Sequence, residues 1–181
     1  PAITGFTGGR PKVQPVVRLF SCLVPKAQVV TSIDMGEQAV AAPQWSGQPF
    51  NPASLPTVTG PLPAASAFAR GVRTVPLVKL AWGRSGDKGD AANIGIIARR
   101  PEYLPFIRAA LTEQAVAGWF AHLVKGKVER FDLPGTHALN FLLQEALGGG
   151  GIASIRMDPQ AKAYAQMLLD FPVPIPAEIA I

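Results

Sequence analysis

The densest run of chemically active side chains in this sequence is Gly83-Arg84-Ser85-Gly86-Asp87-Lys88-Gly89-Asp90, which Ala91-Ala92-Asn93 follows. Five of the eight residues carry a charge or a hydroxyl group, and the other three are glycines. The run separates two apolar stretches, 75–82 and 94–98. A plain hairpin needs a turn of only about two residues. Two acids and two bases in such a connection therefore indicate a long, over-sized hairpin loop with a binding function, carried on two strands.

The chemistry that this run suits best is the binding of an anion. Gly86 and Gly89 would let backbone N–H groups converge on a phosphate or carboxylate, and Arg84 and Lys88 would supply positive charge. The spacing is not that of a phosphate-binding P-loop, and no helix pattern follows it. A structural loop is the alternative, in which Asp87 and Asp90 bind their own backbone and pair with the two bases.

His137 and Asn140 are the next candidates, three positions apart in a stretch whose leucine spacing predicts a helix over residues 136–147. On a helix they would share one side, and a helix N-terminus would disfavour a charged imidazole. They could then line the same pocket as the charged run, or simply cap the turn at Pro134-Gly135. The residues predicted to form the ligand site are Arg84, Ser85, Asp87, Lys88, Asp90, Asn93, His137 and Asn140.

Metal and thiol chemistry find little support. The two histidines, His122 and His137, fit no metal-binding spacing such as H-E-x-x-H, so no metal is expected. Cys22 is the only cysteine, which rules out an internal disulfide and favours a reducing cytoplasm. It lies in an apolar run and is expected to be a small buried residue.

Charge and hydropathy exclude two further classes. The net charge is +5, but only 16% of residues are charged, and no dense basic stripe is present. Nucleic-acid-binding domains usually cluster lysine and arginine on one face, so nucleic acid is not an expected partner. No apolar stretch reaches the roughly 18 residues of a membrane-spanning helix, so no membrane association is expected.

The elements that must position these residues follow from periodicity. Helices are predicted to cover one face of an antiparallel sheet, in the order β-β-α-β-α-β-α, which makes the fold class α+β. The helical pattern over 103–123 is expected to break at Thr112, where a second helix would begin. The predicted strands are 75–82, 93–98, 127–133 and 152–157, and the predicted helices are 103–123, 136–147 and 158–169.

Three segments are expected along the chain. Residues 1–42, with strand-like runs at 13–24 and 28–33, look like the tail of a larger N-terminal domain. Residues 43–71 contain six prolines and only one charged residue, Arg70, which predicts an extended Pro-rich linker. Residues 72–181 form the α+β domain. Because the chain opens on Pro1, we expect it to be part of a longer protein.

The sequence resembles the acyclic terpene utilisation (AtuA-like) family over nearly all of residues 75–171. The resemblance rests on Leu80-Ala81-Trp82 with the charged run, Asn93-Ile94-Gly95, Leu133-Pro134-Gly135, His137-Ala138-Leu139-Asn140-Phe141, and Asp158 with Lys162 and Leu168-Leu169. Gly5-Phe6-Thr7-Gly8-Gly9-Arg10-Pro11 resembles the end of that family's N-terminal domain. The family implies a ferredoxin-like C-terminal domain and a place in bacterial degradation of terpenoid alcohols or branched acids, alongside acyl-CoA carboxylation. The resemblance does not define a reaction or identify catalytic residues, and the cofactor stays unknown.

Two functions remain as hypotheses. In the first, the stretch Arg84–Asn93 binds an acyl-CoA or a branched carboxylate, and a missing N-terminal domain or a sister subunit supplies the reacting groups. In the second, the domain is a non-catalytic assembly or docking module that forms a homo-oligomer. Whether the chain is itself an enzyme stays open between them.

Overall fold

The computed structural model describes residues 71–181 without a gap and, before them, residues 13, 15, 17, 20, 22–43, 47–51 and 53. Contacts divide the chain into a unit of residues 1–19 and 60–181 and a second unit of residues 20–59. The predicted boundaries at 42 and 71 stay predictions, and most of the Pro-rich segment, including Trp45 and Phe68, lies outside the described residues.

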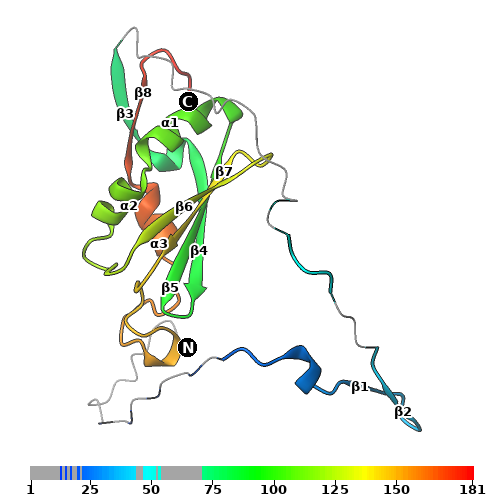
Figure 1. Ribbon diagram of the computed structural model, residues 1–181. Coiled ribbons are helices and arrows are strands. Elements are labelled where there is room, and N and C mark those ends of the chain that lie inside the picture. Colours follow the sequence, from blue (N-terminus) through cyan, green and yellow to red (C-terminus); the bar gives the residue numbers. More distant parts are fainter. Residues whose placement is uncertain are drawn as a thin grey trace. The chain divides into compact units, whose positions relative to one another are not determined.

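A four-stranded antiparallel sheet organises the larger unit (Figure 1). Its strands are β4 (Ala81–Lys88), β5 (Ala91–Ala98), β6 (Val128–Leu133) and β7 (Ala138–Leu143). Their order is β4-β5-β7-β6, so β4 and β6 form the two edges. Two hairpins therefore lie side by side, joined through their second strands.

Short helices and a second strand pair complete this unit. The helices are α1 (Leu104–Ala110), α2 (Glu113–Trp119) and α3 (Tyr164–Leu169). Strand β3 (Val72–Pro76) pairs antiparallel with β8 (Pro172–Pro176), which ties the start of this region to its end. The predicted break at Thr112 is confirmed, because Thr112 Oγ1 accepts a hydrogen bond from the Ala115 N–H at 3.1 Å and so caps α2.

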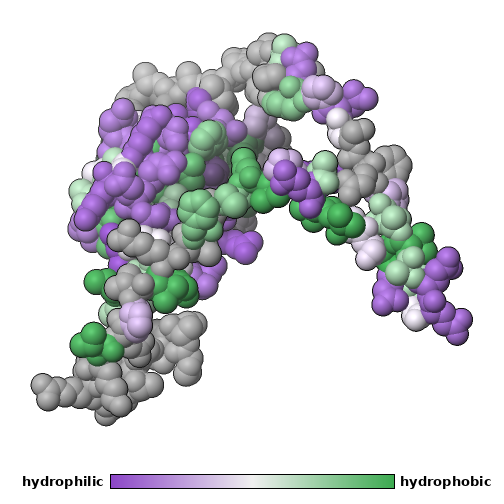
Figure 2. Space-filling view, turned by 60° about the horizontal axis from the view of Figure 1, so that its bottom comes forward, coloured by the Kyte–Doolittle hydropathy of each residue, from purple (hydrophilic) through white to green (hydrophobic). Residues whose placement is uncertain are grey.

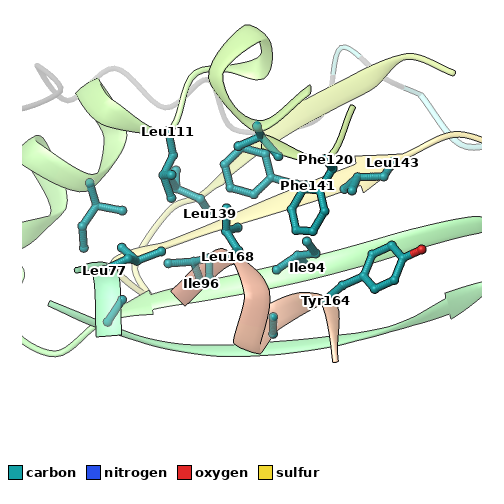
Figure 3. Close-up of a cluster of buried hydrophobic side chains, with 14 of the residues drawn as sticks. Leu77, Ile94, Ile96, Leu111, Phe120, Leu139, Phe141, Leu143, Tyr164 and Leu168 are labelled. Atoms are coloured by element: carbon teal, nitrogen blue, oxygen red, sulfur yellow. The ribbon is translucent and has the colours of Figure 1, made fainter. Parts of the chain in front are cut away.

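The helices cover one face of the sheet and bury the core there (Figure 3). Burying a large apolar side chain contributes roughly 1.5–3 kcal/mol, so this layer stabilises the arrangement of strands and helices. The predicted α+β class, with helices on one face of an antiparallel sheet, is confirmed. The fully buried side chains from both layers include Ile94, Ile96, Leu139, Phe141 and Leu143 from the sheet and Ile107, Val116, Phe120 and Leu168 from the helices.

The charged run is a strand and not the long loop predicted. It belongs to β4, and only Gly89 and Asp90 turn the chain into β5. The predicted strand 75–82 is wrong in extent as well, because the 3-10 turn Leu77–Lys79 separates β3 from β4. Buried and more exposed residues do alternate along parts of β4, where Ala81 and Ser85 are buried. Glycines and charges conceal this alternation, since they lower both the apparent hydrophobicity and the strand propensity.

The predicted helix 136–147 is wrong, because residues 138–143 form β7. Leu139, Phe141 and Leu143 are buried, whereas the residues between them are partly exposed, which is the period of a strand. The leucines also satisfy helical spacing, and in so short a segment the spacing alone does not distinguish a helix from a strand. Pairing with β5 and β6 decides the outcome.

The C-terminal predictions hold only in part. Instead of strand 152–157, the structure has the 3-10 turn Gly151–Ala153 and an irregular stretch. Among the strands that the structure describes, these residues have no neighbour with which their backbone groups could form sheet hydrogen bonds. The helix predicted from 158 begins only at Tyr164. The closing prolines lie in β8. Val173 and Ile175 are in position to bond to β3, and the backbone nitrogens of the prolines point away from β3. Proline is tolerated there because its missing N–H is not needed.

The second unit contains one small hairpin, β1 (Ser32–Asp34) with β2 (Ala39–Ala41), after a 3-10 turn at Lys26–Gln28. The predicted strand 28–33 is therefore mostly wrong, and the described residues of the predicted run 13–24, which are 13, 15, 17, 20 and 22–24, form no strand. Cys22 is exposed, not buried as predicted, since nothing described packs over its apolar run. Large apolar side chains of this unit, such as those of Leu23 and Val30, are exposed. Figure 2 shows hydrophobic residues, coloured green, at the surface of the chain. Among the described residues, no helix is both long and apolar enough to cross a membrane.

Candidate functional site

The face of the sheet opposite the helices carries a separate set of side chains. Directly opposed residues of an antiparallel sheet point to the same face. The register therefore aligns polar and apolar side chains in rows that cross the open face. From β4 through β5 to β7, these rows are Trp82–Ile97–Ala138, Arg84–Gly95–Asn140 and Gly86–Asn93–Leu142.

A chain of polar contacts runs across the open face. Lys88 Nζ donates a hydrogen bond to Asn93 Oδ1 at 3.2 Å. Asn93 Nδ2 in turn donates to Asn140 Oδ1 at 3.2 Å. Arg84 lies on the same face, in the row of Asn140. The structure thus brings four of the predicted site residues together, although on three strands and not on one loop.

Lys162 joins this cluster from a distant part of the sequence. A Cβ built on Gly86 would lie 3.4 Å from Lys162 Nζ, so the ammonium group reaches the open face around the edge of β4. Asp158 fixes the turn that presents this lysine, because its carboxylate accepts the N–H groups of Lys162 at 2.9 Å and Ala163 at 2.8 Å. The sequence predicts a helix start at Asp158, but no local signal ties Lys162 to β4.

Ser85 anchors the Lys162 segment from the other face of β4. Its hydroxyl donates to the carbonyl of Ala161 at 2.6 Å and accepts the N–H of Ala165 at 2.8 Å. The side chain is buried, and Ala161 adopts a left-handed backbone conformation with φ of 54°. Ser85 therefore holds the preceding turn and α3 against β4, and it faces away from the polar cluster.

Asp90 and His137 also lie apart from the cluster. Asp90 Oδ1 accepts the N–H of Gly149 at 2.7 Å and that of Leu147 at 3.2 Å, which fixes the loop after β7. His137 is exposed in the turn between β6 and β7, with φ of 52°, and its carbonyl accepts the Ala98 N–H at 3.0 Å. With residues 138–143 in a strand, His137 and Asn140 do not share a helix side.

A cavity of about 590 Å³ lies along this region. Its polar end is lined by Arg84, Lys88 and Lys162 with one acid, Asp87. Its apolar end is lined by Trp82, Ile97, Leu133 and Ala138. Trp82 is 53% exposed, and the Arg99 guanidinium stacks 4.7 Å from the centre of its ring. Cavities of about 300–1,000 Å³ accommodate small molecules, so the volume suits one ligand with an anionic group and an apolar body.

The arrangement can bind and orient an anion. Arginine and lysine make the strongest hydrogen bonds when the acceptor is charged, and the two asparagines add amide donors and acceptors. Gly95, on the floor between the polar and apolar ends, leaves space because its Cβ position would meet only the Arg84 carbonyl oxygen, at 3.8 Å. Among the described residues, no group of three potential metal ligands occurs.

Comparison with known proteins gives one match. A sequence model of the AtuA ferredoxin-like domain family matches residues 75–174, which contain the whole four-stranded sheet and the cavity. Searches of curated proteins and of solved structures return no match.

Proposed function

The chain belongs to the AtuA ferredoxin-like domain family, and on that basis we propose that it serves in bacterial breakdown of acyclic terpenoids or branched acids by binding a branched carboxylate or its acyl-CoA form. The binding site is the open face of the sheet. The observation that carries this proposal is the juxtaposition, in one cavity, of three cationic side chains with an apolar end. A cytoplasmic location belongs to the same proposal.

The polar end would hold the carboxylate or the phosphates. Arg84, Lys88 and Lys162 line the cavity with only one acid, Asp87, so the lining carries an excess of positive charge. Hydrogen bonds to charged groups contribute about 1.5–3 kcal/mol each. The Lys88–Asn93–Asn140 chain positions the lysine, since Asn93 can accept from Lys88 while it donates to Asn140.

The apolar end would hold the branched hydrocarbon. Trp82 and Ile97 are directly opposed on β4 and β5, and Ala138 continues their row on β7. Covering exposed apolar surface is favourable at roughly 25 cal/mol per Å². The reacting groups would come from an N-terminal domain or sister subunit, so the chain's own share is binding and orientation.

Calorimetric titration of the full chain with isovaleryl-CoA, isovalerate and free coenzyme A tests this function. The Arg84→Ala/Lys88→Ala variant is expected to lose at least about a hundredfold in affinity for isovaleryl-CoA, because two charged hydrogen bonds disappear. Its thermal stability should stay unchanged, since both side chains are exposed.

The matched control is Lys79→Ala/Lys125→Ala, which removes the same charge from two exposed lysines outside the cavity and should bind normally. Equal affinity of both double variants would contradict a specific site. Equal loss of stability in the ligand-free Arg84/Lys88 variant would show that these residues serve the fold.

An assembly role is the second candidate, and one observation favours it. Four large side chains on the open face, Trp82, Ile97, Phe131 and Leu133, are each at least 42% exposed. A second copy that covered this face would form a homo-oligomer and bury them. Light scattering at high protein concentration decides the matter: a monomer favours the ligand site, and a stable dimer that excludes isovaleryl-CoA favours assembly.

A further inference from the structure

The two edges of the sheet differ in how their backbone groups are used. In an antiparallel pair, alternate residues bond to the neighbouring strand and those between them point away from it. The Arg99 N–H bonds to the Leu80 carbonyl at 2.8 Å. This bond identifies which residues of β4 bond to β5 and which point away from it. By the register, the even-numbered residues of β4 bond to β5. The N–H and C=O groups of Gly83, Ser85 and Asp87 therefore point outward from the sheet.

These outward groups form a ladder that no other described strand pairs with. Within the described part of the chain, β4 has no strand partner except β5. The outward N–H groups of Gly83, Ser85 and Asp87 have no hydrogen-bond partner there, and the one bond to an outward carbonyl is from exposed Lys88 Nζ to Asp87 at 3.0 Å. All three residues line the cavity.

The opposite edge, β6, is blocked. The outward N–H of Arg130 donates to Glu113 Oε1 of α2 at 2.9 Å, and the Arg130 guanidinium bonds to the carbonyls of Arg108 and Leu111. Beside it, Arg108 holds Asp132 through two bonds of 2.8 and 2.9 Å, and this hydrogen bonding lowers the pKa of the Asp132 carboxyl. Protected edges are the usual state of native sheets, so the unpaired backbone groups of β4 are a candidate site for another strand.

Charge selects the kind of occupant. A second copy that paired antiparallel through its own β4 would bring Arg84 and Lys88 of one copy beside the same cations of the other. Like charges on adjacent strands destabilise such a pair. An acidic segment would meet Arg84, Lys88 and Lys162 with opposite charge.

We propose that the edge of β4 binds an extended, acidic segment of a partner protein as a fifth, antiparallel strand. The partner's main chain would bond to Gly83, Ser85 and Asp87, and its acidic side chains would lie on the open face beside Arg84 and Lys88. This is strand addition, in which backbone bonds give affinity and alternate side chains give specificity. The strand site goes beyond the ligand function proposed above, because it uses the outward backbone groups of β4, although both sites share Arg84 and Lys88.

The register specifies which peptide amides matter. In antiparallel pairing, a partner residue opposite Ser85 bonds to it and shares its face, whereas the acidic residues between point to the open face. The probe is a capped nonapeptide of alternating valine and glutamate, titrated into the full chain. N-methylation of the valines should abolish binding, because those amides would donate to β4. N-methylation of the glutamates should leave binding intact.

The matched protein variants are Asp87→Pro and Asp87→Ala. Proline removes the outward N–H at an edge position where it is otherwise tolerated, and alanine keeps that N–H while removing the same carboxylate. Asp87→Pro is expected to weaken peptide binding about tenfold or more, whereas Asp87→Ala should bind at least as well as the unmodified chain. Thermal unfolding checks that the proline variant is folded, and the methylated peptides test the ladder without any variant.

Each other outcome overturns the proposal. Failure of the unmodified peptide to bind at millimolar concentration excludes an acidic strand, and equal binding of both methylated peptides excludes the backbone ladder. Tighter binding by the valine-methylated peptide than by the glutamate-methylated one excludes antiparallel addition. Self-association of the chain that Asp87→Pro removes would assign the edge to a second copy.

Discussion

Gly95→Val is expected to abolish binding of isovaleryl-CoA while leaving the domain folded. Gly95 lies on the open face between Arg84 and Asn140, where a Cβ meets only the Arg84 carbonyl oxygen, at 3.8 Å. A branched side chain therefore fits the backbone and occupies the cavity floor. Because valine is favoured in strands, the thermal midpoint should stay equal or rise. Calorimetric titration and thermal unfolding of the same variant measure the two effects.

Gly83→Val is the matched control on the other face of the sheet. Its Cβ would lie 3.1 Å from Ile96 Cδ1 and 3.4 Å from atoms of Ala165 and Leu169, so overpacking should cost about 1–3 kcal/mol. The two variants make the same chemical change on adjacent strands with opposite expected results. Normal ligand affinity in Gly95→Val would contradict the position of the site.

Ser85→Ala is expected to lower the free energy of unfolding by about 2–4 kcal/mol. The substitution removes two buried hydrogen bonds, to the Ala161 carbonyl and from the Ala165 N–H. It leaves that N–H without its partner against β4, and an unsatisfied buried donor costs about 1–3 kcal/mol by itself. Ligand affinity should fall as well, since the released turn carries Lys162. Urea unfolding followed by titration under folded conditions measures both.

Thr112→Ala separates the specific effect from general loss of stability. It removes the cap of α2, which should cost about 1 kcal/mol, but it touches nothing in the cavity. Affinity should therefore stay normal in this variant. A stability loss in Ser85→Ala no larger than in Thr112→Ala would show that the hydroxyl does not anchor α3.

The sequence predicted the charge of the site better than its shape. Arg84, Lys88, Asn93 and Asn140 do meet on one surface, but they do so as strand residues with a two-residue turn at Gly89–Asp90. Glycine and charged residues have low strand propensity in isolation. Pairing with β5 and packing beneath α3 override that propensity, and neither is visible from local composition.

Residues that depend on distant contacts were the hardest to predict. Lys162 reaches Gly86 only because Ser85 and Asp158 hold its turn, and no spacing rule connects positions so far apart in the chain. The strand β7 was missed for a related reason, since its neighbours β5 and β6 decide between two periods that its leucines satisfy equally. By contrast, the break at Thr112 was predictable because a helix cap is local.

A crystal structure of the full chain with isovaleryl-CoA tests the central claim most directly. The predicted result places the ligand's anionic groups within hydrogen-bonding distance of Arg84, Lys88 or Lys162 and its acyl branch against Trp82 and Ile97. Ligand bound elsewhere, or an open face that a second copy covers in the presence of saturating ligand, would contradict the claim.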